Sequence, residues 1–271
     1  MSNYTIEEAM IFVRDGEIPE DFDQWNLANE TGWTVYHQAA RYGRLPVGFD
    51  KWNTANNRGW TVAHVAAHFE HLPEDFDNWM MADNDGTTVA HVAAVNQTFP
   101  PDFIMWAVPD RNGNTVAHVA ATFGTLPEGF DQWAFMNAKG ITVAHEAAMY
   151  HHLPEGFDQW DLRGAYGTTV AHIAAQHGSL PASFDRWDLK DDKGWPVAIT
   201  AALFKNLPEE FRQWDLAATD GTTVAHIMAR SGPLPAEFDR WDMPDNTGFT
   251  VRDVAVAHGY SQRPAMPAPK M

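Results

Sequence analysis

Seven histidines occupy one position of a recurring pattern, and histidine is the side chain that most readily binds metals or exchanges protons near neutral pH. They are His37, His64, His91, His118, His145, His172 and His226, and the series is broken by Ile199 and Asp253. A closer group, His64, His68 and His71, could place two rings on one helix face at a spacing that suits zinc. A metal centre is therefore the first chemistry to consider.

Geometry argues against that metal centre. Equivalent histidines on stacked helices would lie ~8–10 Å apart, whereas each ligand of a zinc ion must approach it to about 2.1 Å. The closer group lacks the acidic partner of the H-E-x-x-H pattern, and the adjacent His151 and His152 add no ligand pattern. We expect the histidines to be structural, and we expect no metal or other cofactor.

An enzyme is also disfavoured. A catalytic constellation is singular, while the His, Thr and Asp residues of this chain recur throughout it. The sequence contains no G-x-S-x-G motif, no phosphate-binding glycine loop and no dinucleotide fingerprint. With no cysteine, disulfides and thiol nucleophiles are excluded. We therefore expect a protein without enzymatic activity.

The recurring pattern is a unit of 27 residues that is copied nine times. Tryptophan marks every copy, and a phenylalanine precedes each tryptophan by three positions. A glycine follows each tryptophan by seven positions, and a valine follows each glycine by three. A fixed period in this range predicts a stacked array, in which each unit buries its apolar face against its neighbours. The tryptophans are Trp25, Trp52, Trp79, Trp106, Trp133, Trp160, Trp187, Trp214 and Trp241.

Residues 140–166 show how one unit is expected to fold. Gly140 suits a turn with positive φ, and Thr142 is a good N-cap for a helix over 143–150. Leu153-Pro154-Glu155 predicts a short second helix, because proline is tolerated in the first helical turn and an acidic residue there complements the helix dipole. Phe157 and Trp160 would share its buried face. The fold class expected is all-α, a solenoid of helix pairs joined by turns and loops.

The string from Gly113 to Gly124, G-N-T-V-A-H-V-A-A-T-F-G, resembles the first-helix signature of ankyrin repeats, with T-V-A-H in place of T-P-L-H. The last copy, which begins at Gly248, resembles the form common in terminal ankyrin repeats. The units are shorter than the ankyrin length of about 33 residues, and the deficit follows Leu-Pro. The resemblance implies protein binding through turn tips. It also implies that each repeated histidine forms turn hydrogen bonds with the threonine three residues earlier.

The expected boundaries follow from the ends of this pattern. Residues 1–260 are predicted to form one repeat array, with a capping helix within 1–17, repeated units over 18–247 and a closing helix within 248–260. Residues 261–271, with three prolines, are expected to be disordered.

Localisation is predicted from the N-terminus and from hydropathy. The first residues lack the basic region of a secretory signal, and no apolar run approaches the roughly 18 residues of a membrane span. We therefore expect a cytoplasmic protein without a membrane partner, and secretion by a route without a signal peptide stays open.

The net charge of −18 supports an alternative function. Direct nucleic-acid binding is disfavoured by this sign, but an acidic decoy could occupy a nucleic-acid-binding protein. Two rows carry much of the charge, one after the phenylalanines and one after the later tryptophans. They comprise Asp23, Asp50, Asp77, Asp131, Asp158, Asp185 and Asp239, and then Asp161, Asp188, Asp215 and Asp242. The rows are equally consistent with solvated helix faces.

Variation between the units indicates where a protein partner would bind. The residue after the turn glycine is a large apolar one in several copies: Trp33, Trp60, Ile141, Trp195 and Phe249. Unit four and its neighbours interrupt the acidic row with apolar side chains: Met80, Ile104, Met105, Val108, Phe135 and Met136. The alternatives are packing between turns for the first group and local repacking near Phe99 for the second. We expect a protein-protein interaction module, acting as a scaffold, inhibitor or effector, whose partner the sequence does not name.

Overall fold

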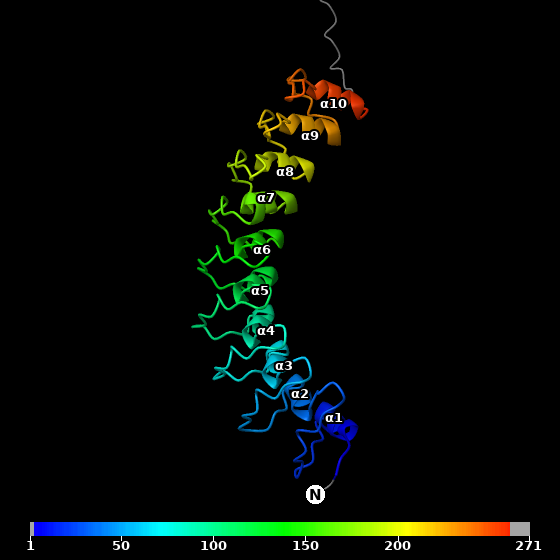
Figure 1. The fold of residues 1–271 in the computed structure, drawn as a ribbon, viewed down its shortest axis with the longest axis vertical. Coiled ribbons are helices and arrows are strands. Elements are labelled where there is room, and N and C mark those ends of the chain that lie inside the picture. Colours follow the sequence, from blue (N-terminus) through cyan, green and yellow to red (C-terminus); the bar gives the residue numbers. More distant parts are fainter. Residues whose placement is uncertain (1–2, 261–271) are drawn as a thin grey trace, which may run out of the picture. The chain divides into compact units, whose positions relative to one another are not determined.

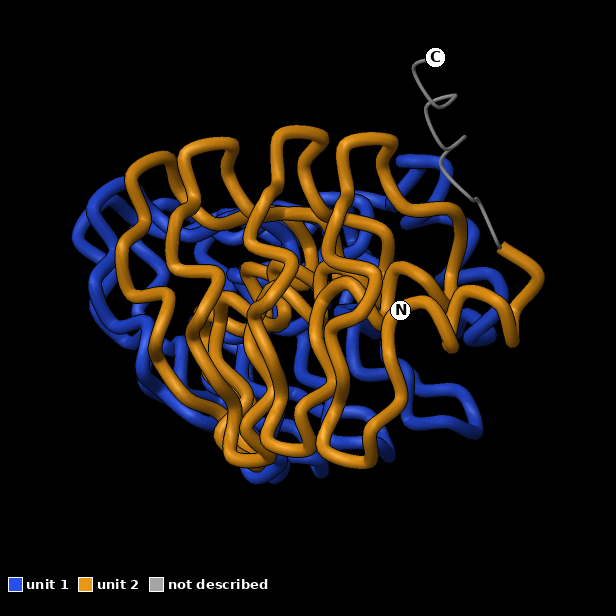
Figure 2. Tube along the Cα trace, turned by 90° about the horizontal axis from the view of Figure 1, so that it is seen from above, with its two compact units in different colours: residues 1–139 blue, residues 140–271 orange. Residues whose placement is uncertain are grey.

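The computed structural model describes residues 3–260, and its chain falls into two compact units, residues 1–139 and 140–271 (Figure 2). In the first unit, five helices follow in chain order and each packs on the next (Figure 1): α1 (Ile6–Asp15), α2 (Val35–Arg41), α3 (Val62–His68), α4 (Val89–Asn96) and α5 (Val116–Phe123). The second unit repeats this arrangement with α6 (Val143–Met149), α7 (Val170–His177), α8 (Val197–Leu203), α9 (Val224–Ser231) and α10 (Val251–Ala257), plus a short 3-10 turn, η1 (Ala165–Gly167).

This architecture confirms a helical repeat with a 27-residue period. Helices α1 and α10 lie within the two ranges where the opening and closing helices were expected, and their capping role stays a prediction. Residues 261–271, expected to be disordered, lie outside the described residues. A single array across residues 1–260 stays a prediction. In the described part of the chain, no helix is both long enough and apolar enough to cross a membrane.

Each repeated helix begins at a residue in extended conformation, which is threonine in most copies. In α3, the Thr61 hydroxyl accepts a hydrogen bond from the His64 N–H, so one of the free donors at the helix start is satisfied. The valine and alanines that follow are completely buried, as at Val62 and Ala66. Helices of seven or eight residues are marginal alone, so packing of these small side chains against the neighbouring helices stabilises them.

The turn before each helix is closed by an Asn or Asp side chain in most copies. Asp83 Oδ1 accepts from the N–H of Asp85 at 2.9 Å and from that of Thr87 at 2.8 Å. Gly86 lies between them at φ +78°, the left-handed conformation that glycine adopts at least cost. An isolated antiparallel bridge then joins Ala82 to Thr88. The positive φ expected at Gly140 is likewise confirmed, at +74°.

The second helix expected in every unit is not formed in the described residues, so the helix-pair architecture implied by the ankyrin resemblance is wrong for them. After Pro154 the chain makes one turn, closed by a bond from the Phe157 N–H to the Pro154 carbonyl at 3.1 Å. Gly156, at φ +79°, leaves the helical region inside that turn. Too few residues follow to repay the cost of helix nucleation.

The Leu-Pro turns hold an aromatic layer in place of a second helix. The Phe157 and Trp160 rings meet edge to face at 5.0 Å, which confirms that these two side chains lie together. Trp160 also meets Phe184 of the following copy at 5.5 Å. Aromatic pairs at such distances add about 0.5–1.5 kcal/mol beyond the area they bury. This layer therefore stabilises the packing of one 27-residue copy on the next.

Two glycines with the same backbone conformation should respond differently to substitution. Gly221 has φ +81°, and a Cβ there would lie 2.6 Å from the Asn246 backbone nitrogen. Gly156 has φ +79°, with no atom within 4 Å of that position. We expect Gly156→Ala to cost about 1–2 kcal/mol of unfolding free energy from backbone strain alone, and Gly221→Ala to cost clearly more. Urea unfolding of both variants measures the two losses of unfolding free energy, and equal losses would contradict the prediction.

Candidate functional site

The repeated histidines join adjacent turns through both ring nitrogens. In His64, Nδ1 accepts from the Thr61 N–H at 3.1 Å, so Nε2 carries the proton and donates to the Thr87 carbonyl at 3.0 Å. The same two bonds recur at His37, His91 and His226. The predicted hydrogen bonds with threonine are thus present, and they fix one neutral tautomer.

Burial lowers the pKa of five of these rings below the ordinary value of 6.5, and the hydrogen bond to the next carbonyl offsets only part of that effect. They are His37, His64, His91, His145 and His172. A buried imidazolium would lose its hydration, and its extra Nδ1 proton would face the threonine N–H. These histidines therefore serve as neutral structural groups at pH 7.

The closer histidine group does not converge on one point. Both nitrogens of buried His64 are used as above, His68 is exposed beside Phe69, and His71 Nδ1 bonds to the Ala40 carbonyl at 2.9 Å. Across the described residues, no three His, Asp or Glu side chains are placed to hold a metal ion.

The residues that follow the turn glycines, called turn-tip residues here, are held in place by hydrogen bonds to their backbones. The Trp60 N–H donates to Asn56 Oδ1 at 3.1 Å, and its carbonyl accepts from His37 Nε2 at 3.0 Å. Trp195 and Phe249 are held by equivalent pairs of bonds from their own turn and from the preceding histidine. A rigid turn is a good platform for a recognition side chain, because little conformational entropy is lost on binding.

The side chains at these tips differ in how much surface they offer. Phe249 is 61% exposed, whereas Trp33, Trp60, Ile141 and Trp195 are half-buried. The Trp60 indole N–H donates to Asp83 Oδ2 of the next copy at 3.0 Å, and the ring stacks on His64. Much of the Trp60 side chain is therefore used in packing between turns, which is the alternative to partner binding for this group. The binding role of the group stays a prediction.

The apolar residues near unit four fall into two groups. Met80, Ile104 and Met136 are exposed by 54%, 82% and 51%, respectively. Met105, Val108 and Phe135 are half-buried. Val108 and Phe135 stand two positions after a tryptophan, where Leu162 and Leu189 stand in later copies, which is consistent with packing, and their role in binding stays a prediction. The three exposed side chains stand at three different positions relative to tryptophan, and their role in binding stays a prediction.

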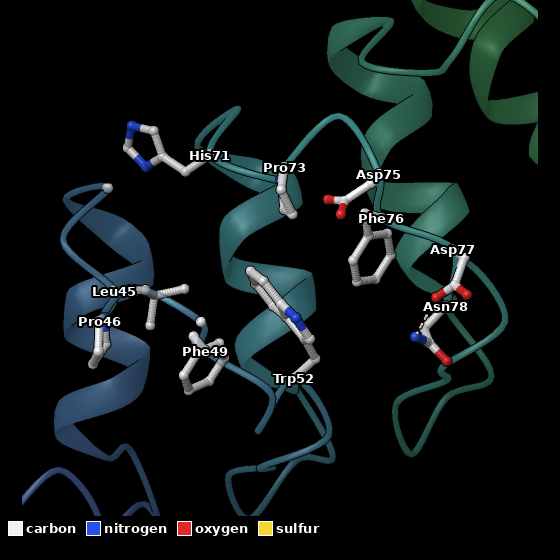
Figure 3. Close-up of a pocket in the computed structure, with 12 residues that line it drawn as sticks. Leu45, Pro46, Phe49, Trp52, His71, Pro73, Asp75, Phe76, Asp77 and Asn78 are labelled. Carbon is white, nitrogen blue, oxygen red and sulfur yellow. Dashed lines mark hydrogen bonds between the residues drawn. The ribbon is translucent and has the colours of Figure 1, made fainter.

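Grooves between successive Leu-Pro turns are a feature that sequence reasoning missed. The first, of about 500 Å³, is lined by Pro46, Phe49 and Trp52 of one copy and by Pro73 and Phe76 of the next. In Figure 3 the Trp52 ring lies between those of Phe49 and Phe76, and the ring centroids are 4.9 and 5.5 Å apart.

Two further grooves have equivalent linings. One of about 220 Å³ lies between Phe103–Trp106 and Pro127–Gln132, and the exposed Ile104 belongs to its wall. One of about 480 Å³, in residues 140–271, lies between Leu153–Trp160 and Pro181–Asp185. The repeated L-P-x-x-F-x-x-W string is the sequence signal for these grooves, although it also predicts the short second helix that does not form.

Carboxylates line the same grooves beside the aromatic rings. They are Asp75 and Asp77 in the first groove, Glu128 and Asp131 in the second, and Glu155 and Asp185 in the third, all of them exposed. A groove with an aromatic floor and an acidic edge favours an extended segment that carries apolar and cationic side chains.

A second missed feature is a set of exposed aromatic residues at the ends of the repeated helices. Ten positions after the turn glycine stand Phe69, Phe123, Tyr150 and Phe204, exposed by 37%, 51%, 46% and 50%. Arg41 lies 5.4 Å from the Phe69 ring centroid, a cation–π contact. The sequence signal was the recurrence of aromatic residues at this position.

Comparison with protein-family models and with curated proteins found no match for this chain. What the chain shows on its own is a helical repeat of about 27 residues with recurring histidine, threonine, phenylalanine and tryptophan positions. A function must therefore be inferred from the surface of this structure.

Proposed function

We propose that this chain is a non-enzymatic protein-binding repeat that holds an extended polypeptide segment along its inter-turn grooves. The observation that carries the proposal is the recurrence of the same groove at three equivalent positions, each with an aromatic floor and acidic edge. The resemblance of the helix motif to ankyrin repeats supports the same class of function. The turn tips, above all Phe249, would add contacts outside the grooves.

The spacing of the repeat suits an extended ligand. Packed helices lie ~8–10 Å apart, and three residues of a polyproline II segment span about 9.3 Å. The two grooves in residues 1–139 lie two copies apart, so about six residues of such a segment would separate the side chains that enter them. Proline and apolar side chains would contact the tryptophans, while lysine or arginine would pair with the carboxylates at the edges.

Ile104→Asp tests this proposal, because Ile104 is 82% exposed in the wall of a groove. We expect peptides selected against the wild-type protein to bind this variant about tenfold more weakly, equivalent to ~1.4 kcal/mol. A charge added to an apolar contact would leave that carboxylate poorly solvated in the complex. Isothermal titration calorimetry with the selected peptides measures the change.

Val47→Asp is the matched control, because Val47 is fully exposed but lines none of the three grooves. It adds the same charge and should leave the affinity within about twofold, as expected of a substitution outside the contact. Equal losses in both variants, or no loss in either, would refute groove binding at unit four.

The acidic-decoy alternative is favoured by the exposure of the aspartates that follow the phenylalanines. The second acidic row supports it less, since Asp161 pairs with Arg186 at 3.2 Å and Asp215 with Arg240 at 2.8 Å. The same titrations at about 50 and 200 mM salt separate the two functions. Binding that collapses with salt and ignores Ile104→Asp would favour the decoy.

A further inference from the structure

Arg212 covers one of the repeated tryptophans with its own guanidinium group. Its Cζ atom lies 5.9 Å from the Trp214 ring centroid, which is a cation–π contact. Nη2 pairs with Glu237 of the following copy at 2.9 Å. Nη1 donates to the carbonyls of Glu209 and Phe211 at 2.7 and 2.8 Å. An aromatic ring, a carboxylate and two carbonyls thus hold one guanidinium between two successive copies.

The first groove presents an aromatic ring and a carboxylate at the same repeat positions. Trp52 stands at the position of Trp214, and Asp75 stands at that of Glu237. Both Trp52 and Asp75 line the groove. In Figure 3 the Asp75 carboxylate points from its turn toward the side on which the Trp52 ring lies. The two groups that recognise a guanidinium at position 212 therefore recur here.

The two carbonyls recur as well, but the arginine does not. The carbonyls of Val47 and Phe49 stand at the positions of the two that hold Arg212, and within the described residues neither accepts a hydrogen bond. The position of Arg212 itself is taken by Asp50, which pairs with Lys51 at 3.0 Å. The first groove thus has the partners for a guanidinium and a second carboxylate in place of the arginine.

The first groove is also open. Trp52 is half-buried, whereas Trp214 is buried. The volume of about 500 Å³ lies within the range of ligand pockets. The other two grooves lack the matching carboxylate, since Gly129 and Ser183 stand at the position of Asp75. Of the three grooves, the first is therefore the one equipped for a cation.

We propose that the first groove binds an arginine side chain of the partner, with the guanidinium on the Trp52 ring and paired with Asp75. This inference rests on the proposed function and deepens it by naming the side chain that is recognised. Arginine fits better than lysine, because a planar guanidinium stacks on an aromatic ring and donates to several acceptors at once. The carbonyls of Val47 and Phe49 accept its remaining N–H groups.

Blocked five-residue peptides test this site directly. Each has two prolines on either side of a central residue, which is arginine, lysine or norleucine. Isothermal titration calorimetry of the full chain measures the affinity for each peptide. We expect the arginine peptide to bind about tenfold more tightly than the norleucine peptide, and clearly more tightly than the lysine peptide.

Asp50→Arg copies Arg212 into the first groove. The new side chain should occupy the ring and Asp75 from within, and we expect it to weaken binding of the arginine peptide about tenfold or more. Asp158→Arg is the matched control, because it makes the same charge change at the same repeat position beside the groove that carries Ser183. It should leave the affinity within about twofold.

Arg212→Gln provides a test by gain of binding. It uncovers Trp214 and Glu237, so we expect more arginine peptides to bind per chain than in the parent protein. Equal affinities for the three peptides would overturn the proposal. Equal losses in Asp50→Arg and Asp158→Arg, or no added site in Arg212→Gln, would also overturn it.

Failure of this inference is distinguishable from failure of the proposed function. The proposed function is tested with selected peptides and Ile104→Asp, which lies in the wall of the second groove. If those peptides respond to Ile104→Asp while the defined peptides show no preference for arginine, groove binding stands and only the arginine site is refuted. Selected peptides that ignore Ile104→Asp would count against the proposed function instead.

Discussion

Replacing Trp160 by alanine is expected to lower the free energy of unfolding by about 3–5 kcal/mol, or to split the thermal transition into two. The indole is 8% exposed and lies between Phe157 at 5.0 Å and Phe184 at 5.5 Å. Its removal leaves a cavity and takes away the contact that joins two successive copies. Chemical denaturation and calorimetry measure the loss and the number of transitions.

Gln159→Ala is the control for that substitution. Gln159 is the neighbouring residue in the same turn, and its side chain is exposed. Its replacement should change the unfolding free energy by no more than about 0.5 kcal/mol, as surface substitutions usually do. If Trp160→Ala melts like the parent protein, the aromatic layer does not stabilise the array.

The sequence predicted the part of the fold that local chemistry determines. Glycine with positive φ, threonine at the N-cap and small alanines after it mark the first helix within each copy, and these features were confirmed. The segment after Leu-Pro was interpreted wrongly because its signals, proline followed by an acidic residue, suit a turn as well as a helix. Whether the segment after Leu-Pro forms a turn or a helix depends on the residues within the turn and on the aromatic contacts between copies.

The candidate site was harder to predict because it forms between copies. Each groove takes its lining from two turns about 27 residues apart in sequence, so no single unit displays it. Variation between units led to Ile104, which does lie in a groove wall, and to Val108, which shares its position with a packing leucine. Variation alone does not distinguish exposed side chains from differently packed ones.

The two breaks in the histidine series have physical explanations. At Ile199 the preceding N-cap is Pro196, which has no N–H for a histidine ring to accept. At Asp253 a carboxylate accepts from the Thr250 N–H at 2.9 Å, in the place of a ring nitrogen. No later copy within the described residues offers a carbonyl to a second ring nitrogen there. Another residue thus replaces histidine at the two copies where one of its two hydrogen bonds could not form.

Acidification below pH 6.5 is expected to destabilise the protein through its buried histidines. Burial lowers the folded-state pKa of His37, His64, His91, His145 and His172, while the unfolded chain keeps values near 6.5. Between those values the unfolded state binds more protons, so the free energy of unfolding falls as pH falls. Above about pH 6.5 both states are neutral at these groups and their contribution is fully present.

Charged groups around these rings modify the effect without reversing its sign. Asp83 opposes the lowering of the pKa of His64, while the neighbouring His91 adds to it. The pKa of Asp215 is lowered by its hydrogen bond from Arg240, and that of Asp253 by its bond from Thr250. Those carboxylates lose their stabilising contribution only as pH falls below their ordinary value of 3.8. Urea unfolding between pH 7.5 and about 5 therefore reports mainly on the histidines.

The chain itself supplies the variant that tests this assignment. Thr169→Pro with His172→Ile copies the natural pair Pro196 and Ile199, the latter completely buried in α8, so the double variant should fold. It removes one titrating ring together with the Thr169 hydroxyl that bonds its Nδ1 at 2.7 Å. Proline has no N–H, so the substitution adds no unpaired donor at position 169. We expect its unfolding free energy to depend less steeply on pH than that of the parent between pH 6.5 and 5. An unchanged slope would mean that protonation of these buried rings does not cause the acid sensitivity.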